Sequence, residues 1–288
     1  MVYFSLPKPY YMKKHSTFAI LFTLFLLINL SSQAQSDSTA KGGIRFKISA
    51  NYNSNLNYYG RTDSLRSSGF FPLGEVWLGK NFYVNAAPIF VNNKLVSMDY
   101  AGTVATLGFQ SITDKWLTNM YVLRPFYEEG TDLAQSVLKA QSGITVSRLN
   151  KIVNVTLGGD VKFSERTDFG ATAGLDHLIL VSNKDGSALV LDPGAYAYAG
   201  TQNFSRTRRK NNSPLPLPGN EETESVQEFN ILAFEFSMPV VYSKNKWQVI
   251  AVPSYILPRN LLQVPNRPDV SEQGKNTFYA TVALKYSF

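Results

Sequence analysis

The chain of 288 residues contains no cysteine and only two histidines, of which His177 alone lies beyond the first 34 residues. The absence of cysteine excludes a disulfide scaffold, a thiol nucleophile and any thiolate metal site. A single histidine provides no His/Cys cluster for a metal, and no sequence motif places a serine beside it as nucleophilic catalysis would require. We therefore predict no metal site, no cofactor and no enzymatic activity, and a structural or solvated role for His177.

Long apolar runs are also scarce. One apolar-rich stretch, residues 18–30, follows Lys13 and Lys14 and precedes a Ser-Ser-Gln-Ala segment that ends at Ala34. Its thirteen residues are too few to span a bilayer as a helix, which needs about 20. The pattern predicts a secretory signal peptide, residues 1–34, cut after Ala34. The alternative interpretation is an uncleaved N-terminal anchor.

Residues 35–288 carry little excess charge. Removing the first 34 residues takes away three of the 28 basic residues and none of the 21 acidic ones, which leaves a net charge of +4. That value does not indicate nucleic-acid binding. No later stretch approaches 18 consecutive apolar residues, so the sequence contains no candidate transmembrane helix there. A protein of this kind can cross a membrane only as a closed barrel, because an open sheet leaves its edges unsatisfied in lipid.

Strict alternation of apolar and polar residues is the strongest pattern in this segment. Between Ile44 and Tyr58, every second residue from Arg45 to Asn57 is polar, and the intervening positions are mostly apolar or aromatic. A period of two is typical of a strand with one wet and one apolar face. Strands of a sandwich usually have about five or six residues. Fifteen alternating residues therefore favour the tilted wall of a barrel.

The last eleven residues repeat this pattern and end the chain on an aromatic residue. One face is wholly apolar or aromatic from Phe278 to Phe288, and the other is mostly polar or small. In this feature the sequence resembles bacterial outer-membrane β-barrel proteins, whose closing strand typically ends in phenylalanine. The resemblance implies that the barrel-assembly machinery recognises this strand through Phe278, Tyr286 and Phe288.

The whole segment 35–288 is predicted to form one all-β domain, an antiparallel transmembrane β-barrel of about 12 strands, with ten or fourteen as alternatives. Short connections are expected near 79–81, 111–114, 150–151, 183–186 and 243–246, and long ones at 59–69, 164–174, 204–227 and 259–276. This alternation is typical of outer-membrane barrels, which have short periplasmic turns and longer external loops. Pro239, Pro253 and Pro258 conflict with regular strands, because proline cannot donate to a ladder, and they predict a local irregularity.

A second resemblance concerns residues 229–260 and the segment 200–204. These two stretches are similar to a group of uncharacterised small outer-membrane barrels of Bacteroidota. The resemblance implies a barrel fold and no particular activity.

The three tryptophans, Trp77, Trp116 and Trp247, each lie near a predicted periplasmic turn. Because indole prefers the membrane–water interface, we predict that they form an interface belt. The alternative is that three core tryptophans fall near turns by chance.

The polar face of the strands predicts the lining of the lumen. The candidates are Arg45, Lys47, Asn51, Asp160, Lys162, Glu235 and Lys285, with Asn53 and Lys139 as further members. The first and last strands are neighbours in a closed barrel, so their basic residues lie on adjoining strands. They either form an eyelet that favours anions or pair with Asp160, Asp192 and Glu235 and fill the barrel.

The segment 204–227 contains a basic, a proline-rich and an acidic block in succession. Its simplest interpretation is a solvated loop. The alternative is a surface patch, with Arg206, Arg208 and Arg209 as candidates, that binds a partner or a polysaccharide.

The sequence thus predicts a protein of the cell outer membrane, with lipid and the assembly machinery as partners. The favoured function is a porin-like channel for small solutes. The second is a non-conducting structural or adhesive barrel whose loops bind a partner. A soluble secreted sandwich is a further alternative.

Overall fold

The computed structural model describes residues 43–62, 65–128, 138–164, 167–209, 221–261 and 274–288, and only the backbone within 203–209 and 221–227. All of these residues belong to one compact unit, Gly42–Phe288. The predicted signal peptide, residues 1–34, lies outside the described residues. Among the residues described, no helix is long and apolar enough to cross a membrane.

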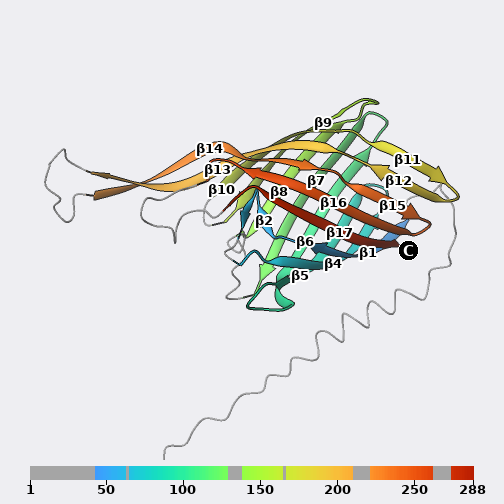
Figure 1. Cartoon of the computed structure of the whole chain (residues 1–288), viewed down its shortest axis with the longest axis horizontal. Helices are drawn as coiled ribbons and strands as arrows, with labels where there is room; N and C mark the ends of the chain where they lie inside the picture. Colours follow the sequence, from blue (N-terminus) through green and yellow to red (C-terminus); the bar gives the residue numbers. More distant parts are fainter. Residues whose placement is uncertain (1–42, 63–64, 129–137, 165–166, 210–220, 262–273) are drawn as a thin grey trace, which may run out of the picture. The chain divides into compact units, whose positions relative to one another are not determined.

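The described part of the chain folds into antiparallel β-strands (Figure 1). In chain order they are β1 (Ile44–Asn53), β2 (Asn57–Tyr58), β3 (Arg61–Thr62), β4 (Ser68–Leu78), β5 (Phe82–Asn92), β6 (Asp99–Ile112), β7 (Trp116–Tyr127), β8 (Ala140–Arg148), β9 (Asn154–Phe163), β10 (Thr167–Asp176), β11 (Ile179–Lys184), β12 (Ser187–Leu191), β13 (Gly194–Arg209), β14 (Glu221–Ser237), β15 (Val240–Lys244), β16 (Trp247–Pro258) and β17 (Thr277–Ser287).

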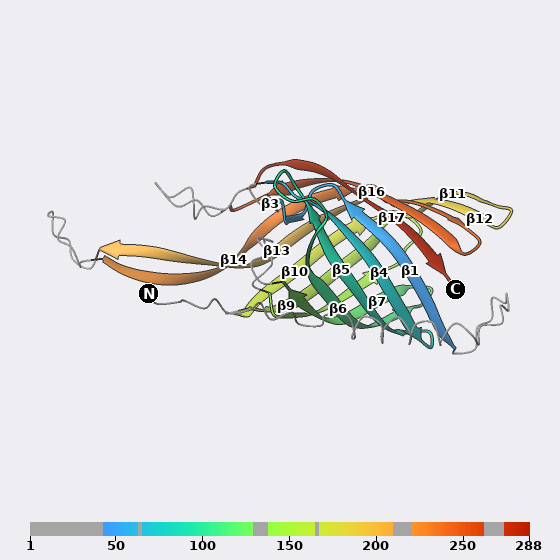
Figure 2. The ribbon, with the colours of Figure 1, turned by 90° about the horizontal axis from the view of Figure 1, so that it is seen from below.

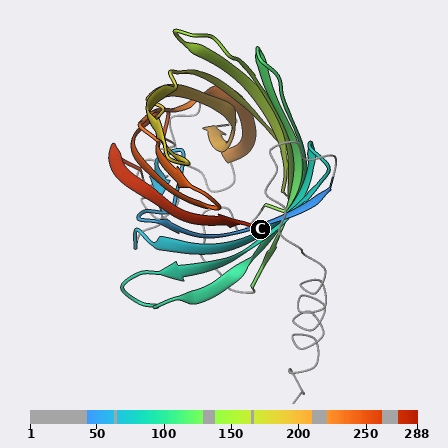
Figure 3. The same cartoon turned by 90° about the vertical axis from the view of Figure 1, so that its right-hand side faces the viewer.

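The strands close into a barrel, because β1 pairs with β4 on one side and with β17 on the other. β11, β12 and β15 continue the lines of β10, β13 and β14 and pair in the same order. Within the described residues the wall therefore has twelve strands, which Figure 3 shows as a ring. The predicted all-β antiparallel barrel of 12 strands is confirmed. Residues 57–62 depart from it, since they form the small β2–β3 hairpin instead of extending the first strand.

Three of the wall strands are interrupted at the same level, next to Pro193 and Pro239. Backbone hydrogen bonds bridge the breaks: His177 N donates to Pro193 O (3.0 Å), Asp192 N to Pro239 O (2.9 Å) and Met238 N to Pro253 O (3.0 Å). The prolines thus provide carbonyl acceptors at positions where their missing N–H groups interrupt the ladder. The irregularity predicted around Pro239 and Pro253 is confirmed.

The two ends of the barrel differ in their connections. At one end, here called the turn end, the connections are 79–81, 113–115, 149–153, 185–186 and 245–246. Both ends of the described chain also lie there, since Phe288 N donates to Phe46 O (3.0 Å). The opposite end, the loop end, carries longer connections except at 164–166, between β9 and β10. The long connection predicted at 164–174 is wrong, because β10 already begins at Thr167 and pairs with β9 from that residue onward.

The two faces of the wall differ in polarity, as the alternation predicts. Along β1, Ile44, Ile48 and Tyr52 are exposed on the outer face, and Lys47 and Asn51 between them are less exposed. On β17 the outer face exposes Phe278, Val282 and Leu284. An apolar outside and a polar inside are the arrangement that a bilayer requires of a barrel.

One hairpin extends beyond the wall (Figure 2). β13 and β14 remain paired as far as Arg209 and Glu221, whereas the pairing of β13 with β10 ends at Gly200 and that of β14 with β16 at Ala233. Among the described strands, the outer part of this ribbon is therefore paired only with itself.

Candidate functional site

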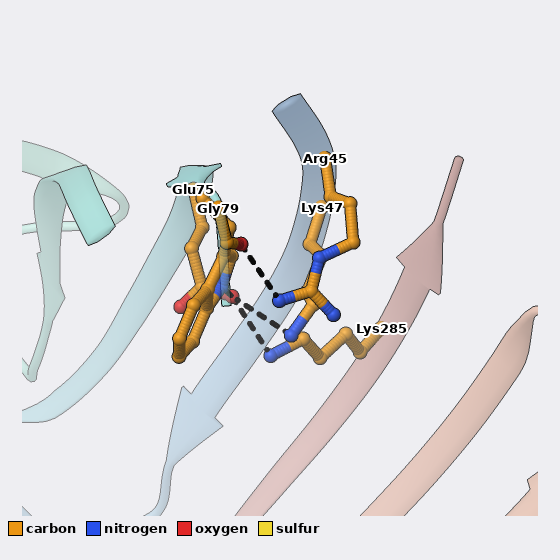
Figure 4. A network of polar contacts seen from close by, with 6 residues as sticks. Arg45, Lys47, Glu75, Gly79 and Lys285 are labelled. Carbon is orange, nitrogen blue, oxygen red and sulfur yellow. Dashed lines mark hydrogen bonds and ion pairs between the residues drawn. The ribbon is translucent and has the colours of Figure 1, made fainter. Parts of the chain in front are cut away.

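A basic cluster lies on the inner face near the turn end (Figure 4). The Nζ atoms of Lys47 and Lys285 lie 3.6 Å and 3.2 Å from the same oxygen of Glu75, Oε1. Arg45 donates to the carbonyl oxygen of Gly79 (3.3 Å). These four charged residues come from β1, β4 and β17, so the closure of the barrel brings them together. Three cations around one carboxylate give the cluster a net charge of +2.

Trp77 belongs to this cluster. It is 8% exposed, and its Nε1 donates to Glu75 Oε1 (2.8 Å). Lys47 Nζ lies 4.6 Å from the centre of its indole ring, a cation–π distance. Trp77 therefore does not belong to the predicted interface belt, because β4 turns Glu75 and Trp77 to the same inner face. Trp116 and Trp247 are 43% and 51% exposed at the turn end, and their role in a belt stays a prediction.

A second group of the predicted lining residues lies closer to the loop end. Lys162 pairs with Asp160 on the same strand, β9. Glu235 of β14 accepts a hydrogen bond from the hydroxyl of Tyr279 (2.9 Å). Asn51 lies between the two groups and donates to the carbonyl oxygen of Phe71 (2.8 Å). The predicted pairing of the basic residues of the first and last strands with Asp160, Asp192 and Glu235 is not what the described residues show: Lys47 and Lys285 pair with Glu75, and Asp160 pairs with Lys162.

The first loop folds into the lumen. It follows β1, yet the rings of Tyr58 and Tyr59 lie 6.0 Å and 5.8 Å from Lys162 Nζ on β9. β9 is six wall strands from β1 in either direction around the ring, so the loop reaches the opposite wall. Burial raises the pKa of both tyrosine hydroxyls above the ordinary value.

Arg61 anchors this loop. It is 7% exposed, and its guanidinium donates to the carbonyl oxygens of Leu232 and Arg259 (3.2 Å each). Beside it, Gly60 has a φ of +76° and touches Pro258, where an added Cβ would lie 2.9 Å from the proline Cδ. Only glycine combines this backbone angle with such a close approach.

Between the loop and the wall is a cavity of about 260 Å³. Its lining combines four tyrosines with two amides, a cation, a carboxylate and one aliphatic side chain. The residues are Asn57, Tyr58, Tyr59, Gln141, Lys162, Tyr198, Glu235, Ile256 and Tyr279.

Other lumenal tyrosines lie flat against the wall, over glycines of the neighbouring strand. A Cβ on Gly174 would lie 2.2 Å from Tyr196 Cδ1, and one on Gly108 would lie 2.1 Å from Tyr83 Cζ. The missing side chains leave room for the rings.

Sequence reasoning missed Glu75 and the lumenal tyrosines. The strand 68–78 is apolar on both faces, and an outward Trp77 would have turned Glu75 outward as well. Glu75 is the single carboxylate in this strand, and placing it inward would have identified the inner face of the strand. The tyrosines occur on both faces of the wall, so their presence alone does not indicate a lumen.

The remaining predicted residues have the following places. Phe278 and Phe288 are exposed on the outer face, and Tyr286 packs against Trp247 with ring centres 4.7 Å apart. The side chains of Arg206, Arg208 and Arg209 lie outside the described residues; their backbone pairs with Glu224, Glu222 and Glu221. Lys139 has its backbone N bonded to Phe163 O at the loop end. A role in assembly or in partner binding stays a prediction.

Comparison with known proteins gives structural similarity alone. No protein-family model and no curated protein matches the sequence. An outer-membrane channel from Pseudomonas putida F1 is similar in structure, with 10% identity and a TM-score of 0.46 over 89% of this chain and 100% of that chain. LpxR from Salmonella typhimurium shows 10% identity and a TM-score of 0.41 over 83% of this chain and 99% of that chain.

The prediction that the chain is not an enzyme is wrong, because LpxR, whose structure is similar, is an outer-membrane enzyme. At 10% identity this similarity does not establish enzymatic activity either. The resemblance to barrels of Bacteroidota stays a prediction. The chain has the fold of an outer-membrane β-barrel, because its twelve-strand wall is closed, its outer face is apolar and its lumen is polar.

Proposed function

We propose that the protein resides in the bacterial outer membrane and is a narrow channel for small solutes, with a preference for anions. The observation that carries the proposal is a closed barrel whose inner face holds a basic cluster of net charge +2, built from β1, β4 and β17. The turn end would face the periplasm and the loop end the outside, as short turns and long loops suggest. The first loop narrows the lumen, so the channel admits only small solutes.

Planar-bilayer conductance of the folded protein, residues 35–288, tests this function. We expect discrete and reproducible current steps, because a polar lumen admits hydrated ions. Reversal potentials in a salt gradient should show anion preference. If protein that is shown to be folded and inserted gives no current, this result would contradict the channel and favour a barrel filled by its own side chains and first loop.

The β13–β14 ribbon favours a second candidate function, the binding of a partner at the cell surface. Replacing residues 206–224 by Asn-Gly joins Ser205 to Ser225, which are already paired, through a two-residue turn. We expect unchanged conductance, because the outer ribbon is paired only with itself among the described strands. If the ribbon binds a partner, adhesion of cells to a polysaccharide-coated surface should be lost in the same variant. Altered current steps would instead show that the ribbon affects the lumen.

A further inference from the structure

Three of the tyrosines that line the cavity form a continuous ladder of rings together with a fourth, Tyr196, beside it. It runs from the first loop onto β13, through Tyr58, Tyr59, Tyr198 and Tyr196. Successive ring centres are 4.5 Å, 5.0 Å and 6.4 Å apart, and the planes of Tyr196 and Tyr198 differ by 15°. Tyr196 lies over Gly174, so its other face is turned away from the wall. Such a ladder presents apolar ring faces with hydroxyl groups at their edges.

The charged groups of the cavity already have partners. Lys162 is paired with Asp160, and Glu235 accepts the hydroxyl hydrogen of Tyr279 (2.9 Å). Asn57 and Gln141 add neutral donors and acceptors to the lining. A ligand with a net charge would have to compete with these pairs. A neutral ligand with many hydrogen-bonding groups would not.

The size of the cavity restricts the ligand further. Its volume of about 260 Å³ lies just below the range of roughly 300–1,000 Å³ found for pockets that bind drug-sized molecules. A single ring with its substituents fits that space. The ligand therefore needs an apolar ring face for the tyrosines and polar groups around its edge for the amides and the carboxylate.

We propose that this cavity is a binding site for a saccharide ring in transit through the lumen. The C–H face of a pyranose stacks on Tyr59 or Tyr198, and its hydroxyls bind Asn57, Gln141 and Glu235. The inference deepens the proposed function and rests on it only in assuming that solutes enter the lumen. It goes beyond ion selectivity, because the basic cluster plays no part in it.

Isothermal titration of the folded full-length barrel in detergent tests the site without requiring conductance. The probes are D-glucose, sorbitol, which has six hydroxyl-bearing carbons but no ring, and phenol, a neutral aromatic ring. We expect glucose to bind and sorbitol to bind at least about tenfold more weakly, a difference of about 1.4 kcal/mol. Equal binding of glucose and sorbitol, or binding of phenol alone, would overturn the proposal.

Single substitutions test whether glucose binds at the tyrosine ladder. Tyr198→Ala should weaken glucose binding at least about tenfold, and Tyr198→Phe should keep most of it, because it retains the ring. Tyr59→Ala, in the loop, provides a second test if the β13 variant does not fold. Tyr52→Ala, on the outer face, is the matched control and should bind glucose as the unaltered protein does. Unchanged binding in both ladder variants would place the sugar elsewhere and overturn the proposal.

The outcomes separate this inference from the channel. Glucose binding by a barrel that conducts no current keeps the site and removes the proposed channel. Current steps without glucose binding keep the channel and remove the site.

Discussion

Reversing the charge of Lys47 and Lys285 together is expected to convert an anion-preferring channel into a cation-preferring one. Both lysines lie within 3.6 Å of Glu75 Oε1, so the double Lys→Glu variant gathers three carboxylates on one patch of the lumen. The charge of the cluster changes from +2 to −2. We expect the ratio of anion to cation permeability to fall at least about tenfold, the equivalent of about 1.4 kcal/mol. Reversal potentials in a salt gradient measure this ratio.

The effect should depend on salt and on position. The Debye length shortens from about 10 Å at 0.1 M salt to about 3 Å at 1 M, so the change should be largest in dilute salt. Lys151→Glu with Lys246→Glu is the matched control, because both lysines are exposed in turns at the same end. Glu75→Gln should shift the ratio in the opposite direction. An unchanged ratio in the double Lys→Glu variant would remove the basic cluster from the path of the ions.

Removing the first loop from the lumen is expected to raise the conductance severalfold. Leu56 N and Ser67 O are already hydrogen-bonded (2.7 Å), so Gly-Gly in place of residues 57–66 closes the chain as a two-residue hairpin. The change removes Tyr58 and Tyr59, which reach the opposite wall near Lys162. A wider lumen should then carry more current in each step. Single-channel recording measures the difference.

A point variant separates the anchor of the loop from its bulk. Arg61→Ala removes the hydrogen bonds that tie the loop to the carbonyl oxygens of Leu232 and Arg259, each from a charged donor and worth about 1.5–3 kcal/mol. We expect larger and noisier steps from this variant, because the loop then leaves its docked position for part of the time. Gly-Gly in place of residues 94–97, an exposed stretch at the same end, controls for shortening a loop. If neither variant alters the steps, the first loop does not limit the current.

The barrel itself could be predicted because its cause is local. Strict alternation at 44–58 and 278–288 reports directly which side chains meet lipid and which do not, and the turns between strands contain their own sequence pattern. The prediction was less accurate where a tertiary contact overrides the alternation. Residues 54–58 continue the pattern, but they leave the wall after Asn53, and Leu56 packs against an apolar cluster around Ile89, Val91 and Ala101.

The lumen was harder to predict because its contacts join strands that are distant in sequence. Arg45, Lys47 and Lys285 could be placed on adjoining strands from closure alone. Their partner, Glu75, could not be predicted, because β4 has apolar residues on both faces and Trp77 suggested the wrong face as the outer one. The sequence by itself determined a closed barrel of about twelve strands, its polar inner face and the basic residues of its first and last strands. Only the tertiary structure decided that Glu75 joins them and that the first loop crosses the lumen, since both depend on which side chains meet after the ring closes.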